Sequence, residues 1–125
     1  MRVGVAALAD ATSADLAAVG KALGGGVAAL EEATRFLVKA DPATAAAGSV
    51  PYLGLLGTVG AGWLLGCQAR AALKRAAERG DISGFFADKV RTARFYADHF
   101  LALAPGHLPA VVGGATVLGF APERL

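Results

Sequence analysis

The amino-acid sequence predicts an all-α fold: an antiparallel up-down helical bundle of three main helices plus one or two short ones. Hydrophobic residues make up 55% of the 125 residues, and Ala, Leu and Val dominate them, whereas aromatic residues contribute 7%. Ala and Leu lead the helix-propensity scale, and the alternating or β-branched runs that are typical of strands are scarce. Apolar residues instead recur three or four positions apart, and Pro and Gly signals divide the chain into long segments.

Length and composition predict a single helical domain over residues 1–125. A chain of this size is typical of one domain and can bury enough surface to form a core. We expect the core to span about residues 14–120, with residues 1–13 and 121–125 at the periphery. Charged residues make up 18% of the chain, below the roughly 25% of globular proteins. The surplus of apolar residues therefore requires a large core, a partner or a membrane.

The first long helix is predicted over residues 14–39. Residues 2–10 precede it and are apolar enough for two or three helical turns. Thr12 or Ser13 can cap the long helix, because a side-chain oxygen there accepts a hydrogen bond from a free backbone N–H. The apolar spacing continues in phase through Gly24-Gly25-Gly26, which favours one helix over two helices with a break. Its stripe consists of Leu16, Val19, Leu23, Val27, Leu30, Thr34 and Leu37.

The second helix is predicted to begin at Asp41-Pro42, because Asp caps helices and Pro fits the first helical turn. We expect this helix to reach Arg79 and to end at Gly80, a residue that readily adopts the left-handed conformation of helix ends. Pro51 lies inside it. Proline removes one backbone hydrogen bond and crowds the preceding turn, which predicts a kink or a restart near Ser49.

The middle of this second helix is uncharged over residues 43–69. A helix that is apolar nearly all round is typical of a central, buried position. Cys67 is then expected to be a buried small hydrophobic residue, and Tyr52 and Trp63 are expected to anchor the core or an interface. The same stretch is long enough to span a bilayer, as is the uncharged stretch 100–122, so a two-helix membrane hairpin is the alternative. Prolines interrupt both stretches and a charged amphipathic helix separates them, so we favour a water-soluble bundle.

The third main helix is predicted over residues 82–104. Asp81 is expected to cap it, and Pro105-Gly106 is expected to end it. Its apolar stripe consists of Phe86, Val90, Ala93, Ala97, Phe100 and Leu101. A short last helix is expected over residues 108–118. Because the connections are short, neighbouring helices should run antiparallel.

The net charge of +2 is too small to indicate a nucleic-acid partner. The charge is nevertheless uneven along the chain. Residues 70–94 carry seven basic side chains against three acidic ones, which leaves a local net charge of +4. We interpret this region as a solvated helix–turn–helix rim, and a docking surface for an acidic partner or a phosphate is the alternative.

The sequence predicts no catalytic, cofactor-binding or metal-binding residues. His99 and His107 are interpreted as structural, since a Pro-Gly break separates them and no metal-ligand spacing includes them. The glycines at 24–26 and 57–62 lack the preceding strand and the Gly-Lys-Ser/Thr of a phosphate loop, so close helix packing explains them better. The single cysteine excludes an intrachain disulfide, and the N-terminal residues show no signal-peptide pattern. We therefore expect a cytoplasmic protein.

Two runs of sequence carry a resemblance to a known family. Residues 50–65 read VPYLGLLGTVGAGWLL and residues 89–97 read KVRTARFYA. Both resemble the additional C-terminal helical domain of bacterial acyl-CoA dehydrogenases, in the subgroup that includes 3-methylmercaptopropionyl-CoA dehydrogenase. The resemblance covers roughly residues 14–120, and the first long helix matches by pattern alone. It singles out packing or interface residues, namely Pro51, Tyr52, Gly57, Gly62, Trp63, Arg94, Phe95 and Tyr96.

The resemblance implies a role in a larger enzyme. Full-length members are FAD-dependent oxidoreductases of fatty acid metabolism that form an α,β double bond in an acyl-CoA. Their flavin site and catalytic glutamate lie in the preceding domains, and no residue of this chain matches those motifs. We therefore expect a non-catalytic ancillary domain that packs on flavin-bearing domains or a flavin-bearing subunit, with a homo-oligomer as a further option. The alternative is a small membrane-associated protein with a two-helix hairpin.

Overall fold

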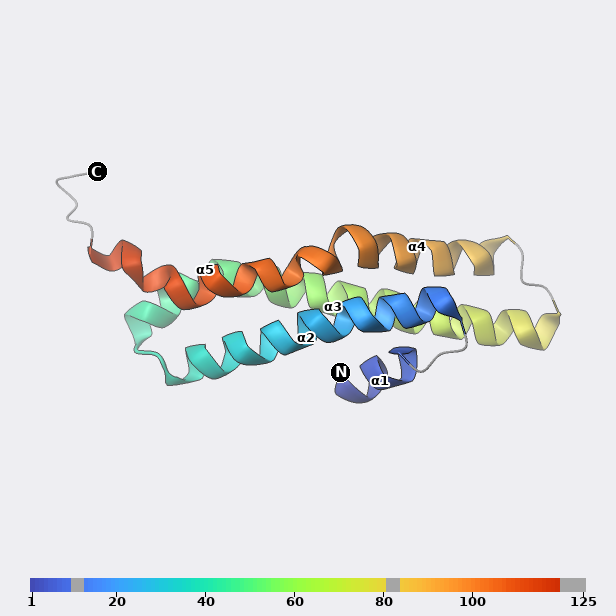
Figure 1. The fold of residues 1–125 in the computed structure, drawn as a ribbon, viewed down its shortest axis with the longest axis horizontal. Helices are drawn as coiled ribbons and strands as arrows, with labels where there is room; N and C mark the ends of the chain where they lie inside the picture. Colours follow the sequence, from blue (N-terminus) through green and yellow to red (C-terminus); the bar gives the residue numbers. More distant parts are fainter. Residues whose placement is uncertain (10–12, 81–83, 120–125) are drawn as a thin grey trace.

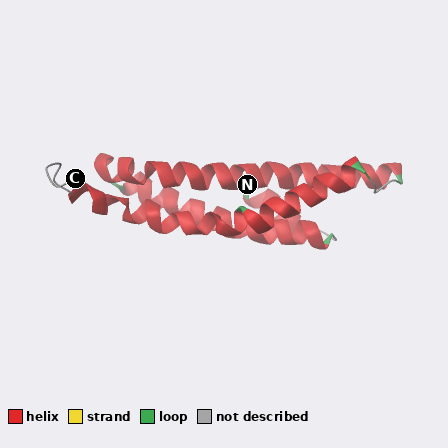
Figure 2. Cartoon of the chain, turned by 90° about the horizontal axis from the view of Figure 1, so that it is seen from above, coloured by secondary structure: helices red, strands yellow, loops and turns green. Residues whose placement is uncertain are grey.

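The computed structural model describes residues 1–9, 13–80 and 84–119 and confirms the all-α prediction. The elements are α1 (Arg2–Ala9), α2 (Ala14–Lys39), α3 (Pro42–Arg79), α4 (Phe85–His99), η1 (Leu101–His107), α5 (Leu108–Gly113) and η2 (Gly114–Gly119), where η denotes a 3-10 helix. Helices α2 and α3 form a long antiparallel hairpin, and the segment from α4 to η2 returns beside α3 (Figure 1). The short α1 packs on α2 and α3. The result is an elongated rod that is helical along its described length (Figure 2).

Helix α2 is a single helix through Gly24-Gly25-Gly26, as the unbroken phase predicts. Gly26 is buried where α2 meets α3, and a Cβ at this position would lie 2.9 Å from Cγ2 of Val59. The predicted stripe is buried from Leu16 to Leu30 and half-buried beyond. The glycine run therefore permits a close helix contact, which offsets its low helix propensity.

The start of α2 differs from the prediction in one detail. Ser13 occupies the N-cap position with an extended backbone, but its side chain makes no capping hydrogen bond. Asp15 in the first turn places a negative charge near the positive end of the helix dipole. The other predicted cap, Thr12, lies outside the described residues.

Helix α3 begins and ends where the sequence predicts. The Asp41 carboxylate accepts hydrogen bonds from the backbone N–H groups of Ala43 and Thr44, at 3.0 and 3.2 Å. Gly80 adopts the left-handed conformation at φ 66° and terminates the helix. These two caps satisfy backbone groups that a helix otherwise leaves without partners.

Pro51 lies half-buried within α3 and does not restart it. The predicted restart is wrong because the turn before Pro51 packs tightly against the end of the third layer. A Cβ at Gly48 would lie 2.7 Å from the backbone oxygen of Val111, and one at Gly114 would lie 3.0 Å from the backbone oxygen of Ala47. Pro51 leaves this Ala47 oxygen without its usual N–H partner, and the close backbone packing holds the turn in helical form.

The core lies between α2, α3 and the third layer. Its largest fully buried side chains are Leu8, Val19, Leu23, Leu55, Val59, Leu101 and Val111. Leu8 belongs to α1 and is 1% exposed. The segment that we expected at the periphery therefore contributes a residue to the core.

We predicted that α3 would be buried all round its circumference. The structure buries one side of α3 and leaves the other exposed. Leu55, Val59 and Ala69 are fully buried, whereas Leu53 is 67% exposed. Cys67 is exposed, so the prediction of a buried cysteine is wrong. The physical reason is that the bundle has too few layers to surround α3, and one side of it stays uncovered.

The third layer starts later and extends further than predicted. The predicted start at residues 81 and 82 lies outside the described residues, and Gly84, with φ 62°, directly precedes α4. Helix α4 ends at His99, and the chain continues as a 3-10 helix through Pro105 and does not stop there. A 3-10 helix aligns residues three apart, which keeps both Leu101 and Ala104 in the core.

Candidate interaction surfaces

Two tyrosines connect helices through their hydroxyl groups. Thr34 donates its hydroxyl proton to the Leu30 carbonyl at 2.7 Å, so the Tyr52 hydroxyl, 2.9 Å from Thr34 Oγ1, acts as donor to it. This contact links α3 to α2. Tyr96 of α4 donates to the Thr58 carbonyl of α3 at 3.2 Å. Both tyrosines are half-buried, and these bonds satisfy their polar atoms.

Gly62 and Trp63 lie at contacts that leave no room for larger neighbours. A Cβ at Gly62 would lie 2.5 Å from Cδ1 of Leu101, so the absence of a side chain sets the distance between α3 and η1. The indole Nε1 of Trp63 lies against Gly4, where a Cβ would approach it to 2.8 Å. Trp63 therefore holds α1 against α3.

Arg94 joins α4 to α2 at the surface. Its Nε donates to Asp98 Oδ2 at 2.8 Å, and its Nη1 donates to Asp15 Oδ1 at 3.1 Å. The hydrogen bond to Asp98, followed by the smaller effect of Asp15, raises the pKa of Arg94. All three side chains are about half-exposed, so the pair with Asp15 connects α4 to α2 and both pairs contribute little to stability.

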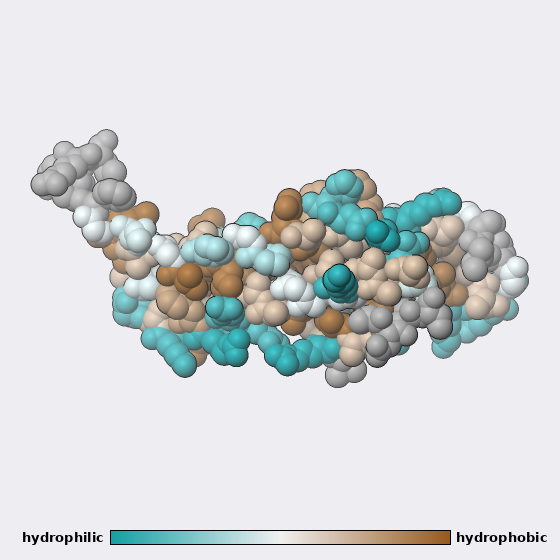
Figure 3. All heavy atoms as spheres, in the orientation of Figure 1, coloured by the Kyte–Doolittle hydropathy of each residue, from teal (hydrophilic) through white to brown (hydrophobic). Residues whose placement is uncertain are grey.

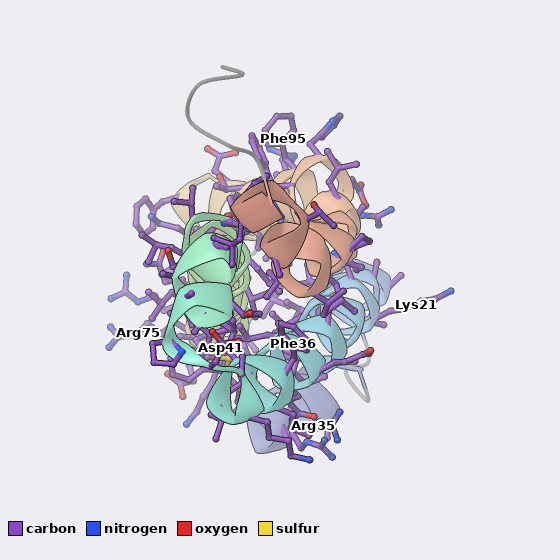
Figure 4. The ribbon with its side chains drawn as sticks, turned by 90° about the vertical axis from the view of Figure 1, so that its left-hand side faces the viewer. Lys21, Arg35, Phe36, Asp41, Arg75 and Phe95 are labelled. Carbon is purple, nitrogen blue, oxygen red and sulfur yellow. The ribbon has the colours of Figure 1, made fainter. Side chains whose placement is uncertain are left out.

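An exposed apolar patch lies on the outer side of the third layer, and we call Phe95, His99, Phe100 and Leu103 the α4 patch. The Phe95 ring centroid lies 4.4 Å from that of His99 and 6.2 Å from that of Phe100. Phe95 is 57% exposed and Leu103 is 70% exposed. Figure 4 shows Phe95 pointing away from the bundle. Clustered exposed apolar side chains of this kind typically mark a contact with a partner.

A second exposed apolar surface follows the outer side of α3, and we call it the α3 face. It consists of Ala46, Val50, Leu53, Gly57, Gly60, Leu64, Cys67 and Ala71, which are exposed except for the half-exposed Gly60. A Cβ at Gly57 or Gly60 would meet nothing within 4 Å. Sequence reasoning missed this surface, because periodicity does not reveal which side of a uniformly apolar helix its neighbours cover.

The basic residues gather around a groove at the far end of α3 and α4. Its lining residues are Gln68, Ala71, Ala72, Arg75, Phe85, Phe86 and Lys89. Lys89 Nζ lies 5.0 Å from the ring centroid of Phe85, and the Arg79 guanidinium carbon lies 5.6 Å from that of Phe86. Arg75 extends into solvent (Figure 4). This end therefore combines an apolar floor with a solvated basic rim.

Comparison with known proteins identifies the family to which the chain belongs. Residues 4–119 match the family described as acetyl-CoA dehydrogenase C-terminal like. The chain belongs to this family. It is also 44% identical over 61 residues to 3-methylmercaptopropionyl-CoA dehydrogenase of Ruegeria pomeroyi, a match that covers 49% of the chain and 10% of that relative, in its C-terminal part. The match thus spans a tenth of the relative's length, and no solved structure matches the chain.

The eight residues that the resemblance singles out do not form one site in this C-terminal-like domain. Four of them lie at contacts between helices, namely Tyr52, Gly62, Trp63 and Tyr96, whereas Arg94 forms surface ion pairs. Phe95 and Gly57 lie on the two exposed surfaces, and Pro51 is half-buried within α3, next to Val50 of the α3 face. The eight residues are thus divided between helix contacts, surface ion pairs and the two exposed surfaces, and their role at an interface stays a prediction.

A hollow of the C-terminal-like domain lies between α1 and α2. It has a volume of about 710 Å³, is open to solvent, and is lined by Met1, Arg2, Val27, Leu30, Glu31, Thr34 and Arg35. Arg2 forms an ion pair with Glu31, and this hydrogen bond lowers the pKa of the Glu31 carboxyl. On this side, hydrophilic residues follow the lower edge of α2, with apolar surface above them (Figure 3). Across residues 1–9, 13–80 and 84–119, no group of three His, Cys, Asp or Glu side chains gathers closely enough to hold a metal ion.

Two helical stretches, Pro42–Arg79 and Phe85–Gly119, are long and apolar enough to cross a membrane by length and composition alone. Charged residues nevertheless lie beside the uncharged part of α3. Tyr96 bonds to α3 at Thr58, and Arg94, two residues before it, pairs with Asp15 of α2. A bilayer around the middle of α3 would enclose these charges, which is costly.

Proposed function

We propose that this chain is the non-catalytic ancillary C-terminal domain of an FAD-dependent acyl-CoA dehydrogenase, and that it packs on the catalytic domains through the α4 patch. Membership of the family supports the assignment to such an enzyme. The relative that it matches is many times longer than the match, which supports a domain that works beside others. The observation that carries the proposal is the exposed cluster around Phe95, which this domain leaves uncovered.

The flavin would belong to the catalytic domains. The hollow between α1 and α2 does not fit it, because aliphatic side chains and the exposed Arg2–Glu31 pair line an open surface there. The site offers no glycine-rich turn at a helix N-terminus, the feature that commonly binds a dinucleotide pyrophosphate. We therefore assign no catalytic step to this chain. Its proposed role is structural, namely to provide a contact surface.

The α4 patch can supply the apolar centre of a larger contact. Full burial of a Phe or Leu side chain contributes about 1.5–3 kcal/mol relative to full exposure. Phe95, Phe100 and Leu103 are each about half to two-thirds exposed. Covering all three would contribute roughly 3–5 kcal/mol at the area coefficient used for apolar burial. An aromatic cluster of this kind is typical of the residues that dominate binding energy at interfaces.

The proposal is tested by mixing the chain with the flavin-bearing domains of a family member that lacks this C-terminal region. We expect a complex on gel filtration and a Kd in the micromolar range or tighter by calorimetry. Phe95→Ser combined with Leu103→Ser should weaken binding at least about tenfold, which corresponds to a loss of about 1.4 kcal/mol. Val38→Ser is the matched control, because Val38 is 80% exposed on α2, away from the patch. Equal binding by the wild type and the double variant would contradict the proposal.

The same proposal places the chain in the cytoplasm with its parent enzyme. The exposed, unpaired Cys67 suits a reducing compartment. The alternative, a membrane-associated hairpin, draws support from the length and apolar composition of Pro42–Arg79. Cell fractionation without detergent separates the two. Recovery in the membrane pellet after a high-salt wash would favour the hairpin.

A further inference from the structure

The α3 face carries a heptad pattern that the bundle itself does not use. Its eight positions, from Ala46 to Ala71, are spaced alternately four and three residues apart. This is the spacing of a seam between two paired helices. The contacts of α3 within the bundle use the opposite side, where Leu55 and Val59 are buried. The exposed seam therefore has the form of a helix–helix interface that lacks its second helix.

We propose that a second copy of this chain covers the α3 face, with the two α3 helices antiparallel about a two-fold axis between Thr58 and Val59. A two-fold interface needs a surface that is complementary to itself. The α3 face meets this requirement, because it has the same kinds of residue in both directions from this point. The opposing pairs are Gly57 with Gly60, Leu53 with Leu64, Val50 with Cys67, and Ala46 with Ala71.

The glycines at the centre allow the two helices to approach closely. A Cβ placed at Gly57 or Gly60 would meet no neighbouring group outside the local backbone of α3 within 4 Å, so their surface is open to a second helix. On either side of them, the exposed side chains of Leu53 and Leu64 face each other across the seam. The helices are therefore closest at the glycines, and the leucines pack on both sides of this point.

Charge selects the antiparallel direction. The C-terminal end of α3 carries Arg70, Lys74, Arg75 and Arg79 with only Glu78 of opposite sign, whereas residues 43–69 are uncharged. Parallel helices would place two basic ends side by side, which is repulsive. In the antiparallel register, the basic end of one helix reaches the beginning of the other, and Arg75 comes opposite Pro42, beside Asp41. Opposite charges then meet at both ends of the pair.

The groove at the basic end provides further contact area in the same register. It borders the α3 face at Ala71 and contains Phe85, which is 69% exposed. The first two turns of the partner helix, with the exposed small residues Ala46 and Ser49, would lie over it. A seam from Ala46 to Ala71 is about 38 Å long and about 10 Å wide. Together with the groove it gives an interface at the small end of the range for specific contacts, so we expect a weak dimer.

This inference does not rest on the proposed function, because the two surfaces lie on different sides of the bundle. Figure 4 shows Arg75, next to the α3 face, and Phe95, in the α4 patch, pointing in different directions. Substitutions in one surface leave the other intact. Failure of self-association and failure of docking on catalytic domains are therefore distinguishable.

Disulfide trapping tests the register directly, because Cys67 is the chain's single cysteine. Val50→Cys places a second thiol opposite Cys67 of the other copy. Within one helix these positions are 17 residues apart, or about 25 Å, far beyond the roughly 4.4–6.8 Å between Cα atoms of a disulfide. We expect mild oxidation of V50C to give a linked dimer on a non-reducing gel, and the wild type to stay unlinked. Efficient linking of the wild type through Cys67 alone would overturn the antiparallel register.

Sedimentation of the full chain without detergent tests the association itself. The wild type should dimerise at about 100 µM or below, and Leu53→Glu should weaken dimerisation at least about tenfold. Leu103→Glu in the α4 patch is the matched control and should dimerise like the wild type. A monomeric wild type at this concentration, or loss of dimers with L103E and not with L53E, would overturn the proposal. Binding of the monomer to phosphatidylcholine vesicles, abolished by L53E, would also overturn it and assign the face to lipid.

Discussion

Replacing a glycine of α3 by Ala should raise or lower the stability of the domain according to what surrounds it. Gly62 and Gly57 give the clearest contrast. Replacement of either by Ala improves helix propensity by about 1 kcal/mol. A Cβ at Gly57 meets nothing within 4 Å, so Gly57→Ala should keep this gain. A Cβ at Gly62 would lie 2.5 Å from Cδ1 and 2.7 Å from both Cγ and Cδ2 of Leu101. The whole Leu101 side chain must therefore move.

The cost at Gly62 follows from the burial of Leu101. This side chain is 1% exposed, so it has no solvent-filled space to enter. Overpacking of a core typically costs about 1–3 kcal/mol. Set against the propensity gain of about 1 kcal/mol, Gly62→Ala should be destabilising by up to about 2 kcal/mol. The two alanine variants should then differ in free energy of unfolding by about 1–3 kcal/mol in total.

Urea unfolding followed by circular dichroism measures this difference. It should be run at a protein concentration well below the Kd of the proposed dimer, because Gly57 also lies on the α3 face. Gly57→Ala should raise the midpoint, Gly62→Ala should lower it, and the slope m should stay constant. Gly62→Ala combined with Leu101→Val should recover part of the loss, which a double-mutant cycle isolates. Equal midpoints for the two single variants would refute the packing argument.

Three further predictions concern other contacts. Tyr96→Phe removes the hydrogen bond to Thr58 and should lower the free energy of unfolding by about 1 kcal/mol, whereas an unchanged urea midpoint would show that the bond contributes nothing. Leu8→Ala should cost about 2–4 kcal/mol because Leu8 is fully buried, and a loss below about 0.5 kcal/mol would show that α1 is not part of the core. The hydrogen bond from the Thr44 side chain, and then that from its backbone N–H, lower the pKa of Asp41. A lowered pKa in the folded state means that the unfolded state binds more protons. The stabilisation is therefore present above the ordinary value of 3.8 and is lost as pH falls below it. The Tm of Asp41→Ala should accordingly fall less than that of the wild type between about pH 5 and pH 3, and parallel Tm curves would contradict this.

The sequence predicted the helix bounds well where its signals were local. Asp41 and Gly80 bound α3 because capping depends on residues within one turn. The unbroken spacing of apolar residues correctly predicted one continuous helix α2 through its glycine run, because these residues must all face the same core. Signals that depend on tertiary packing were less reliable. Pro105 lies inside η1 because Leu101 and Ala104 both reach the core there.

The candidate surfaces were predictable only in part. The resemblance pointed to Phe95, and Phe95 does lead an exposed patch. The α3 face was hidden because a uniformly apolar helix gives no sign of which side its neighbours cover. Cys67 was assigned to the core on this basis and is exposed. Only the positions of α2 and α4 around α3 show which apolar residues stay outside.

The two exposed surfaces differ in chemistry, and this difference argues for two kinds of contact. The α3 face combines leucines with open glycines at heptad spacing, so it fits another helix lying along it. The α4 patch presents the rings of Phe95 and Phe100 together with Leu103 where α4 passes into η1, so it fits a pocket on a folded partner. The apolar surplus of the sequence exceeds what three layers of helix can bury. Its division between a seam and a patch therefore matches the two proposed contacts, a second copy at the α3 face and a folded partner at the α4 patch.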